Sequence, residues 1–383
     1  MTRKIFMLVL SVAIVASLIL AGCAPEVAPP PAEEEEEAAP EEEEEEEEAP
    51  PTAPEAEVIK WTWQDNSGPG TTQLIMLEEL AKRVKAATGG TFDISVVAEG
   101  TIVPRAESTA AVKDGMLDLA TNCPSVDEGR LGPVVYLCGA SGLPAGPSSM
   151  DGVAWAYKGD GLEIMSEVWK DWAYVIGVQP GAPELFCHSN KKLEKAADLK
   201  GLKFRTRGMW AEIMGEYGVA VVTIAAGELY SGVERGVLDA FELGPPSFNW
   251  PYGFQEVCKY IGLPGIQSPG YAKPVWVNKS SWDGLDAHLQ DLLKDEIMTM
   301  ALDTYMSQEI EDGAAIQKYL DYGTEIFTVS EELQTDIAAK SKALIAKFAA
   351  EDPQFAEIWE QRQAFNKEWT SLTGIVPDYT IFD

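Results

Sequence analysis

The sequence holds only two histidines in 383 residues, and its 29 lysines and arginines are outnumbered by 62 aspartates and glutamates, which gives a net charge of −33. So large an excess of negative charge argues against binding to nucleic acid. Four enzyme signatures are also missing, namely GxSxG, HExxH, GxxxxGK followed by Ser or Thr, and a GxGxxG that opens a helix. We therefore expect no catalytic residue and no enzyme. An exported lyase or hydrolase is the weakest alternative, because no set of acid, base and nucleophile is visible.

The few histidines and cysteines are not arranged as metal ligands. His188 lies at the end of a predicted strand, and His288 lies in the polar start of a long helical pattern, where a solvated or capping role is expected. The cysteines of the folded part show no CxxC spacing and no paired histidines, so a zinc site is not expected. We interpret them as buried thiols, with a disulfide as the alternative in an exported protein. These residues are Cys123, Cys138, Cys187 and Cys258.

Residues 1–22 have the pattern of a lipoprotein signal peptide. Two cations, Arg3 and Lys4, precede an apolar run over residues 5–20, and two small residues precede Cys23. The apolar run is shorter than the roughly 20 residues that span a bilayer. We expect cleavage before Cys23 and acylation of its thiol. The protein would then be anchored by lipid at the outer face of the cytoplasmic membrane or in the periplasm.

Residues 23–57 form a predicted tether. Residues 24–56 contain only Pro, Ala, Val, Thr and Glu, a composition from which no hydrophobic core forms. Proline and like-charge repulsion favour an extended chain between anchor and folded part, with an acidic interaction tail as the alternative. Sixteen negative charges lie in this segment and two positive ones in the signal, so residues 58–383 carry a net charge of −19.

The folded part begins with a repeated strand and helix pattern. Residues 58–63 alternate as a strand does, residues 71–87 place an apolar stripe on one helical face, and Gly89 and Gly90 end that helix. Strands over 92–98 and 117–121 flank a helix over 107–114. This β-α-β order predicts an α/β fold with a largely parallel sheet.

A second sheet is predicted in the middle of the chain. Strands are predicted in this region at 174–179, 185–188, 202–206 and 219–224, where the second sheet begins, and a further strand is expected at 275–278. Residues 285–322 are strongly helical, with a buried stripe that includes Leu293, Ile297 and Met300. A helix of this length is expected to bridge two lobes.

The block Asp198 to Arg207, DLKGLKFRTR, places arginine on a predicted buried strand. A buried guanidinium needs an anionic partner, and its planar fork suits bidentate binding of a carboxylate. For Arg207 we expect solvent or a surface ion pair, whereas the residues alone leave Arg205 open between a surface pair and a ligand clamp.

A second block runs from Glu228 to Pro246 and reads as a short helix, a glycine stop and a strand. Glu242 emerges at the C-terminal end of that strand, where ligands usually bind in open α/β sheets. Together the two blocks contain DLKGLKxR and ExYxxxxxGxxDAxE. In order and spacing they resemble the solute-binding proteins of tripartite ATP-independent periplasmic (TRAP) transporters, as do residues 98–104 and 111–119. The resemblance covers nearly all of the folded part.

The resemblance implies roles for particular residues. In that family the strand arginine clamps the substrate carboxylate, and Arg205 has the matching position. The end of the second block, DAxE followed by Gly-Pro, is similar to the subgroup that binds 2-oxo and 2-hydroxy acids with a metal cation. Glu242 matches the carboxylate that contacts the cation. The backbone carbonyl of Leu243 matches a further ligand of the cation, although the family often has an aromatic residue at that position. Glu184 stands where glutamine is common, and Ser268 stands where another acid is common.

Oxygen ligands of this kind suit Ca²⁺ or Na⁺ better than zinc. Trp63, Gln64 and Asn122 follow first-sheet strands at their pocket ends, and we expect them either to contact the ligand or to serve in packing and turns. No catalytic cofactor is expected. The expected partners are a small organic acid and the integral-membrane subunits of a TRAP transporter.

By this resemblance the fold is a two-lobe, periplasmic-binding-protein-like α/β fold with discontinuous lobes and a long bridging helix. Lobe I comprises 58–182 with 271–310, and lobe II comprises 183–270 with 311–383. A ligand in the cleft that touches both lobes would favour their closure. The expected function is capture of a 2-oxo or 2-hydroxy monocarboxylate for transport. A sensory binding module and a TRAP binder for another organic acid or polyol-type solute are the alternatives.

Overall fold

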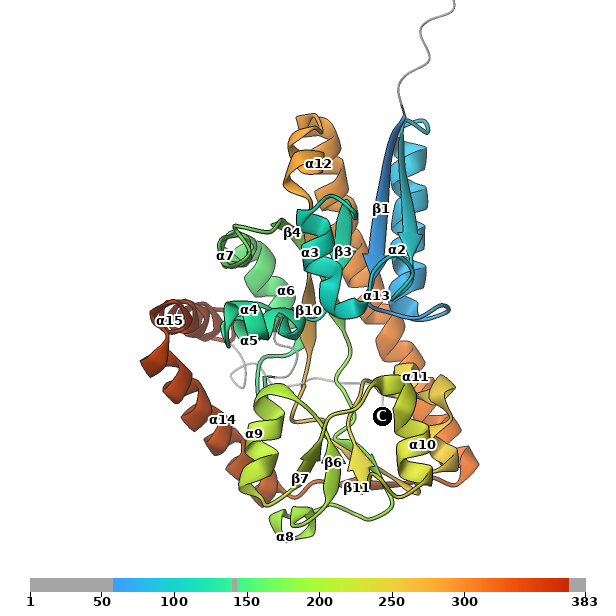
Figure 1. Ribbon diagram of the computed structural model, residues 1–383, viewed down its shortest axis with the longest axis vertical. Helices are drawn as coiled ribbons and strands as arrows, with labels where there is room; N and C mark the ends of the chain where they lie inside the picture. The colour runs from blue at the N-terminus through green and yellow to red at the C-terminus, as the bar shows by residue number, and fades with distance from the viewer. Residues whose placement is uncertain (1–57, 140–142, 372–383) are drawn as a thin grey trace, which may run out of the picture. The chain divides into compact units, whose positions relative to one another are not determined.

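Two β-sheets surrounded by helices make up the part of the chain that the computed structural model describes, residues 58–139 and 143–371 (Figure 1). The first sheet has the strand order β2-β1-β3-β10-β4, and the second has the order β11-β9-β5-β8-β6-β7. This two-sheet architecture confirms the predicted α/β fold class. The predicted signal peptide, Cys23 and the tether lie outside the described residues.

The first sheet is parallel except for one strand. Its strands are β1 (Ile59–Asp65), β2 (Phe92–Val97), β3 (Leu119–Thr121), β4 (Tyr174–Gly181) and β10 (Tyr271–Val277). Strand β1 pairs in parallel with β2 and β3, whereas β10 runs antiparallel to both β3 and β4. The expected strand at 275–278 begins earlier, at Tyr271.

The second sheet likewise contains one reversed strand. It consists of β5 (Cys187–Ser189), β6 (Lys203–Arg205), β7 (Ala220–Val222), β8 (Ala240–Phe241), β9 (Tyr260–Leu263) and β11 (Glu325–Thr328). Strand β6 is parallel to β7 and β8, and β9 is parallel to β11, but β5 runs antiparallel to β8 and β9. Both reversed strands follow a crossing between the sheets, from β4 to β5 and from β9 to β10. A chain that leaves one sheet at the carboxyl ends of its parallel strands enters the other sheet at the edge where the parallel strands of that sheet also end. The entering strand must therefore run antiparallel to them.

Local sequence explains the first helix. In α2 (Thr72–Ala87) the apolar stripe Leu74, Leu77, Leu80, Ala81 and Val84 is buried, as predicted. Gly89 and Gly90 follow with φ of 59° and 89°, which only glycine adopts without strain.

The remaining helices cover both sheets. Around the first sheet lie α3 (Ser108–Lys113), α4 (Glu128–Leu131), α5 (Val135–Gly139), α6 (Ser149–Lys158), α7 (Gly161–Val168) and α12 (Lys279–Asp283). With the second sheet lie α8 (Ala196–Leu199), α9 (Gly208–Glu216), α10 (Leu229–Glu234), α11 (Pro246–Asn249) and α14 (Glu331–Glu351). Among the described residues, no helix is both long enough and apolar enough to cross a membrane.

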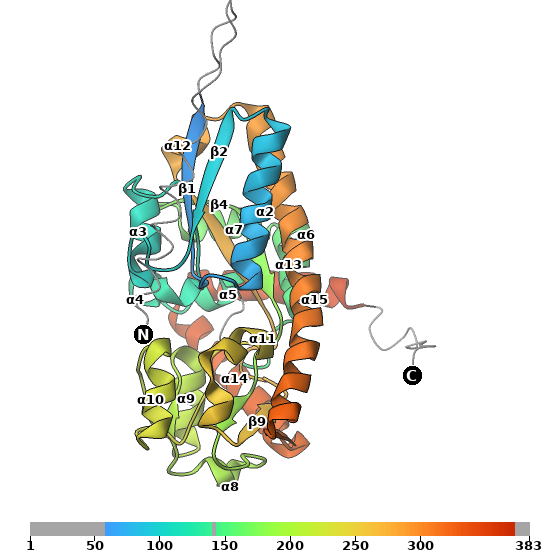
Figure 2. The ribbon, with the colours of Figure 1, turned by 90° about the vertical axis from the view of Figure 1, so that its right-hand side faces the viewer.

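The long helix α13 (Ala287–Tyr322) runs along both sheets (Figure 2). It packs on β4 and α2 in its first part and on α11 and β11 further along, as a bridging helix was predicted to do. Its predicted stripe is buried at Leu293, Ile297 and Met300. Beyond these residues the buried face turns polar and includes Gln308 and Asp312.

The final helix departs from the predicted lobe boundary, which places 311–383 with the second sheet. Helix α15 (Pro353–Trp369) packs on α5 and α6, which belong with the first sheet. Trp155 donates from Nε1 to Gln361 Oε1 at 2.8 Å, and the Arg362 guanidinium lies 4.1 Å from the Trp155 ring centroid. The C-terminal helix therefore returns to the first sheet.

Candidate functional site

A cleft of about 890 Å³ is lined by residues from both sheets. Its lining includes residues 66–68 after β1, Cys123 after β3, residues 206–208 after β6 and residues 242–245 after β8. The carboxyl ends of parallel strands from the two sheets thus meet at one space, the usual position of a ligand site in open α/β sheets.

The charge of this cleft differs from that of the whole chain. Its lining holds four cationic side chains, Arg105, Arg205, Arg207 and Lys273, and four acidic ones, Glu99, Glu184, Glu228 and Glu242. Residues 58–383 as a whole carry −19. Cations are therefore concentrated in the cleft, which suits an anionic ligand despite the acidic surface.

Arg205 is held at the end of β6 by the strand beside it. Its Nη1 donates to the backbone oxygen of Glu242 at 2.8 Å and to Glu242 Oε1 at 3.3 Å, and its Nε donates to Ile224 O at 3.3 Å. Only 8% of the side chain is exposed, and this burial lowers the pKa of Arg205. Among the described residues, none accepts a hydrogen bond from Nη2. That nitrogen is available for a ligand oxygen.

We expected Arg207 to lie in solvent or in a surface ion pair. Its side chain is exposed, but it lines the cleft. The reason is local, because the chain leaves β6 and turns into α9 directly after Arg207, so that residues 206–208 form part of the wall.

Glu184 and Ser268 lie on the two segments that cross between the sheets. Glu184 N donates to Ser268 O at 3.1 Å, and Gln267 Nε2 donates to Leu185 O at 2.7 Å. The segments touch at Gly265, where a Cβ would stand 1.9 Å from the Glu184 oxygen. Two connections distant in sequence are thereby joined at the cleft.

The carboxyl group of Glu184 is affected by Glu242 in the cleft. Desolvation, followed by repulsion from Glu242, raises the pKa of Glu184 well above its ordinary value. Like charges held together in this way favour a proton or a cation between them.

Several buried polar atoms of the cleft wall have no partner among the described residues. They are Ser268 Oγ, Gln267 Oε1, Thr206 Oγ1 and Trp210 Nε1. A buried polar group without a hydrogen bond is costly, so each of these atoms offers a hydrogen bond to a molecule or ion in the cleft. Apart from Ser268, the sequence did not single out these residues, because no motif marks them.

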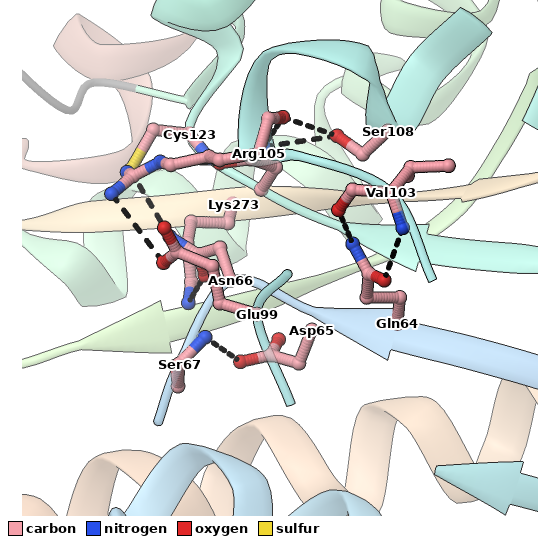
Figure 3. A network of polar contacts seen from close by, with 11 residues as sticks. Gln64, Asp65, Asn66, Ser67, Glu99, Val103, Arg105, Ser108, Cys123 and Lys273 are labelled. Carbon is pink, nitrogen blue, oxygen red and sulfur yellow. Dashed lines mark hydrogen bonds and ion pairs between the residues drawn. The ribbon is translucent and has the colours of Figure 1, made fainter. Parts of the chain in front are cut away.

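Trp63 and Gln64 are buried in the first sheet and do not line the cleft. Trp63 Nε1 donates to Thr121 Oγ1 at 2.8 Å. Gln64 Nε2 donates to Val103 O at 2.9 Å, and its Oε1 accepts from Val103 N at 3.1 Å (Figure 3). The structure therefore assigns them the packing role, in place of direct contact with a ligand.

Asn122 also lies behind the cleft wall, where it supports Arg105. Its Oδ1 accepts from Arg105 Nε at 3.1 Å, and its Nδ2 donates to Ser108 Oγ at 2.9 Å. The guanidinium of Arg105 also forms an ion pair with Glu99, with 3.8 Å between Nη1 and Oε2 (Figure 3). Arg105 lines the cleft, so Asn122 acts through it.

The histidines take no part in the cleft. His188 is buried, its ring stacks on Phe241 with centroids 5.1 Å apart, and burial lowers its pKa to about 3. His288 is exposed at the start of α13, in line with a solvated role. Cys138, Cys187 and Cys258 are buried free thiols, as expected, whereas Cys123 lines the cleft.

The donor set fits a hard cation better than a soft one. No group of three or more His, Cys, Asp or Glu with the arrangement of a metal site is found in residues 58–139 and 143–371. The two carboxylates, however, lie in a wall that also contains the unpaired oxygens of Ser268 and Gln267. Oxygen donors of this kind are those that Ca²⁺ and Na⁺ take.

A family model described as bacterial extracellular solute-binding protein, family 7, matches residues 64–352. A monocarboxylate 2-oxoacid-binding periplasmic protein of Nostoc sp. (strain PCC 7120) is 26% identical over 312 residues, which cover 81% of this chain and 85% of the relative.

Two solved structures share the fold. A TRAP transporter solute-binding protein from Bordetella bronchiseptica RB50, with copurified calcium and picolinate in its bound site, matches with a TM-score of 0.74 at 21% identity over 83% of this chain and 95% of that one. A TRAP periplasmic solute-binding protein from Pseudoalteromonas atlantica T6c, with bound sodium and pyruvate, has a TM-score of 0.73 at 24% identity over 83% and 97%.

Proposed function

Because this chain belongs to the family 7 bacterial extracellular solute-binding proteins, we propose that its cleft binds a small carboxylic acid together with a cation and delivers the acid to a TRAP-type transporter. Membership agrees with the resemblance carried by residues 198–207 and 228–246. It also makes the protein a binding component and not an enzyme.

The observation that carries the proposal is the geometry of Arg205. The guanidinium is buried at the carboxyl end of β6, and Nη2 has no partner among the described residues. A carboxylate that accepts from Nη2 would complete its hydrogen bonds, and charge-assisted bonds of this kind are the strong ones. The unpaired Trp210 Nε1 lies in the same wall and offers a second donor.

The cation is proposed at Glu242 and Glu184, with the Leu243 carbonyl and Ser268 as further oxygen donors. It would offset the negative charge of Glu242, which otherwise repels an anionic ligand. The Bordetella and Pseudoalteromonas proteins hold calcium or sodium beside picolinate or pyruvate, which supports Ca²⁺ or Na⁺ here. The 2-oxo and 2-hydroxy acids are the class to test first, since the Nostoc relative is a 2-oxoacid binder.

Capture by two sheets suggests how binding is signalled. Arg205 lies on β6 of the second sheet, whereas Lys273 lies on β10 of the first sheet and Asn66 directly follows β1. A ligand that contacts both sheets stabilises the arrangement in which the sheets are close together. A membrane partner then recognises that arrangement. We also propose that lipidation at Cys23 and the tether of residues 23–57 keep the protein near that partner.

The direct test is mass spectrometry of small molecules that copurify with the protein, beside metal analysis of the same sample. The expected result is a small organic acid with stoichiometric calcium or sodium. Calorimetric titration with 2-oxo and 2-hydroxy acids then ranks the candidates. A copurified ligand without an acidic group, together with no heat from any acid, would refute the proposal.

A further inference from the structure

Lys273 is a buried cation without an acidic partner. It lies on β10, only 3% of it is exposed, and its Nζ donates to Asn66 Oδ1 at 2.7 Å (Figure 3). No carboxylate of the described residues lies within 4.0 Å of this ammonium group. Burying an unpaired charge is expensive, and lysine is rarely fully buried unless it is paired. The cost points to a charge that arrives with a ligand.

The position of Lys273 on β10 brings its ammonium group to the cleft. Val275, two residues further on, pairs with Thr121 at the end of β3, and Lys273 itself pairs with Gln179 on β4. Lys273 is therefore level with the residues that follow the carboxyl ends of β1 and β3. Asn66, its hydrogen-bond partner, is the first residue after β1.

The positive charge of Arg105 is offset by an acidic neighbour, whereas that of Lys273 is not. Figure 3 shows the Arg105 guanidinium beside Glu99. Nη1 lies 3.8 Å from Glu99 Oε2, and Asn122 Oδ1 accepts from Nε. On the opposite wall Arg205 is paired with Glu242. Lys273 differs from both arginines, because its neighbours are the Asn66 amide and the ring of Tyr271, whose centroid lies 5.8 Å from Nζ.

We propose that Lys273 binds a second anionic group of the ligand, a carboxylate, at the end opposite the carboxylate that Arg205 holds. The inference rests on the proposed function, in that the same acid occupies both subsites. It also narrows that function, because a monocarboxylate bound at Arg205 leaves Lys273 without a counter-charge. An acid with carboxylates at both ends contacts both sheets through charge.

The test uses two acids that differ only at the far end, 2-oxopentanoate and its terminal dicarboxylate 2-oxopentanedioate, titrated into the full-length protein with calcium present. The wild type should bind the dicarboxylate roughly tenfold to a hundredfold more tightly, the usual contribution of a hydrogen bond to a charged group. Lys273→Met keeps the length of the side chain but removes the charge, and it should abolish this preference. Lys60→Met is the control, since Lys60 is exposed on β1 of the same sheet.

The outcomes separate this inference from the proposed function. Equal preference in the wild type and in Lys273→Met, or a wild type that favours the monocarboxylate, overturns the role of Lys273 while leaving carboxylate capture intact. If neither acid binds the wild type and the molecule that copurifies with it has no acidic group, the proposed function fails. The melting temperature of the ligand-free variants then decides about Lys273. A rise in Lys273→Met supports a charge kept for an anion, because removing an unpaired buried charge stabilises the fold. A fall shows a structural lysine and overturns the inference.

Discussion

One nitrogen of Arg205, Nη1, donates both to the backbone oxygen of Glu242 at 2.8 Å and to the Glu242 carboxylate at 3.3 Å. The backbone bond fixes the direction of the guanidinium, and the carboxylate provides a counter-charge while the cleft is empty. A cation that binds Glu242 withdraws that counter-charge. Arg205 then attracts the ligand carboxylate more strongly, so cation and acid should bind with positive coupling.

Replacement of Arg205 by lysine should weaken acid binding without unfolding the protein. Lysine keeps the charge but loses the planar fork that holds a carboxylate. We expect affinity to fall roughly tenfold to a hundredfold, the effect of losing one charge-assisted hydrogen bond. Calorimetry with the copurified acid measures it. Arg235→Lys, an exposed arginine beside Ser231, is the matched control, and equal small effects in both variants would place the carboxylate elsewhere.

Removal of the cation should weaken binding of the acid through Glu242. In sodium-free buffer with a calcium chelator, the wild type should lose affinity, because the negative charge of Glu242 in the cleft wall is then no longer offset by the cation and repels the ligand. Glu242→Gln has nearly the same shape without the charge and should bind the acid with little response to the chelator. Unchanged affinity of the wild type after chelation would exclude a cation from the mechanism.

Local sequence patterns predicted the elements that depend on local contacts. The strand at 58–63, the helix at 71–87 and the strand at 92–98 correspond to β1, α2 and β2 within two residues at each end. Strands β9 and β11 were not predicted, because each is four residues long and is specified by its partner across the sheet. The reversed direction of β10 was missed for the same reason, since it follows from a crossing of the chain.

The same distinction holds at the cleft. Arg205, Glu242, Glu184 and Ser268 were proposed from motifs, and all four line the cleft, although their contact with a ligand stays a prediction. Lys273 and Trp210 carry no local signature, because their place depends on which strands become neighbours. Trp63 and Gln64 lie near the carboxyl end of β1, as predicted, but their side chains point into the packed interior.

Substitution of Cys23 should abolish membrane attachment. Only a thiol forms the thioether of a lipoprotein, so Cys23→Ser should yield an unlipidated protein that is released or remains uncleaved. Metabolic labelling with a radioactive fatty acid and membrane fractionation measure the change. Cys138→Ser is the control, since this thiol is buried in the folded part. Lipid label that persists in the Cys23 variant would contradict the anchor.

Asp312 should make the stability of the protein depend on pH. Its carboxylate is buried on α13, Oδ1 accepts from Ser247 N at 2.7 Å, and Oδ2 has no partner among the described residues. Desolvation raises the pKa of Asp312 from 3.8 to about 6. Between these values the folded protein binds more protons at this site than the unfolded chain does, so its contribution to stability falls as pH rises from about 4 to about 6.

Asp312→Asn should remove this dependence, because the amide oxygen still accepts from Ser247 N but carries no charge. A difference of about two pKa units corresponds to about 3 kcal/mol at most, so above about pH 6 the variant should be more stable than the wild type by up to that amount. At about pH 4, where Asp312 is largely protonated in the folded state, the two proteins should differ little. Urea unfolding across this pH range, with Asp295→Asn on the exposed face of α13 as control, measures the effect. Parallel pH profiles for the wild type and Asp312→Asn would show that the folded-state pKa of Asp312 is not raised.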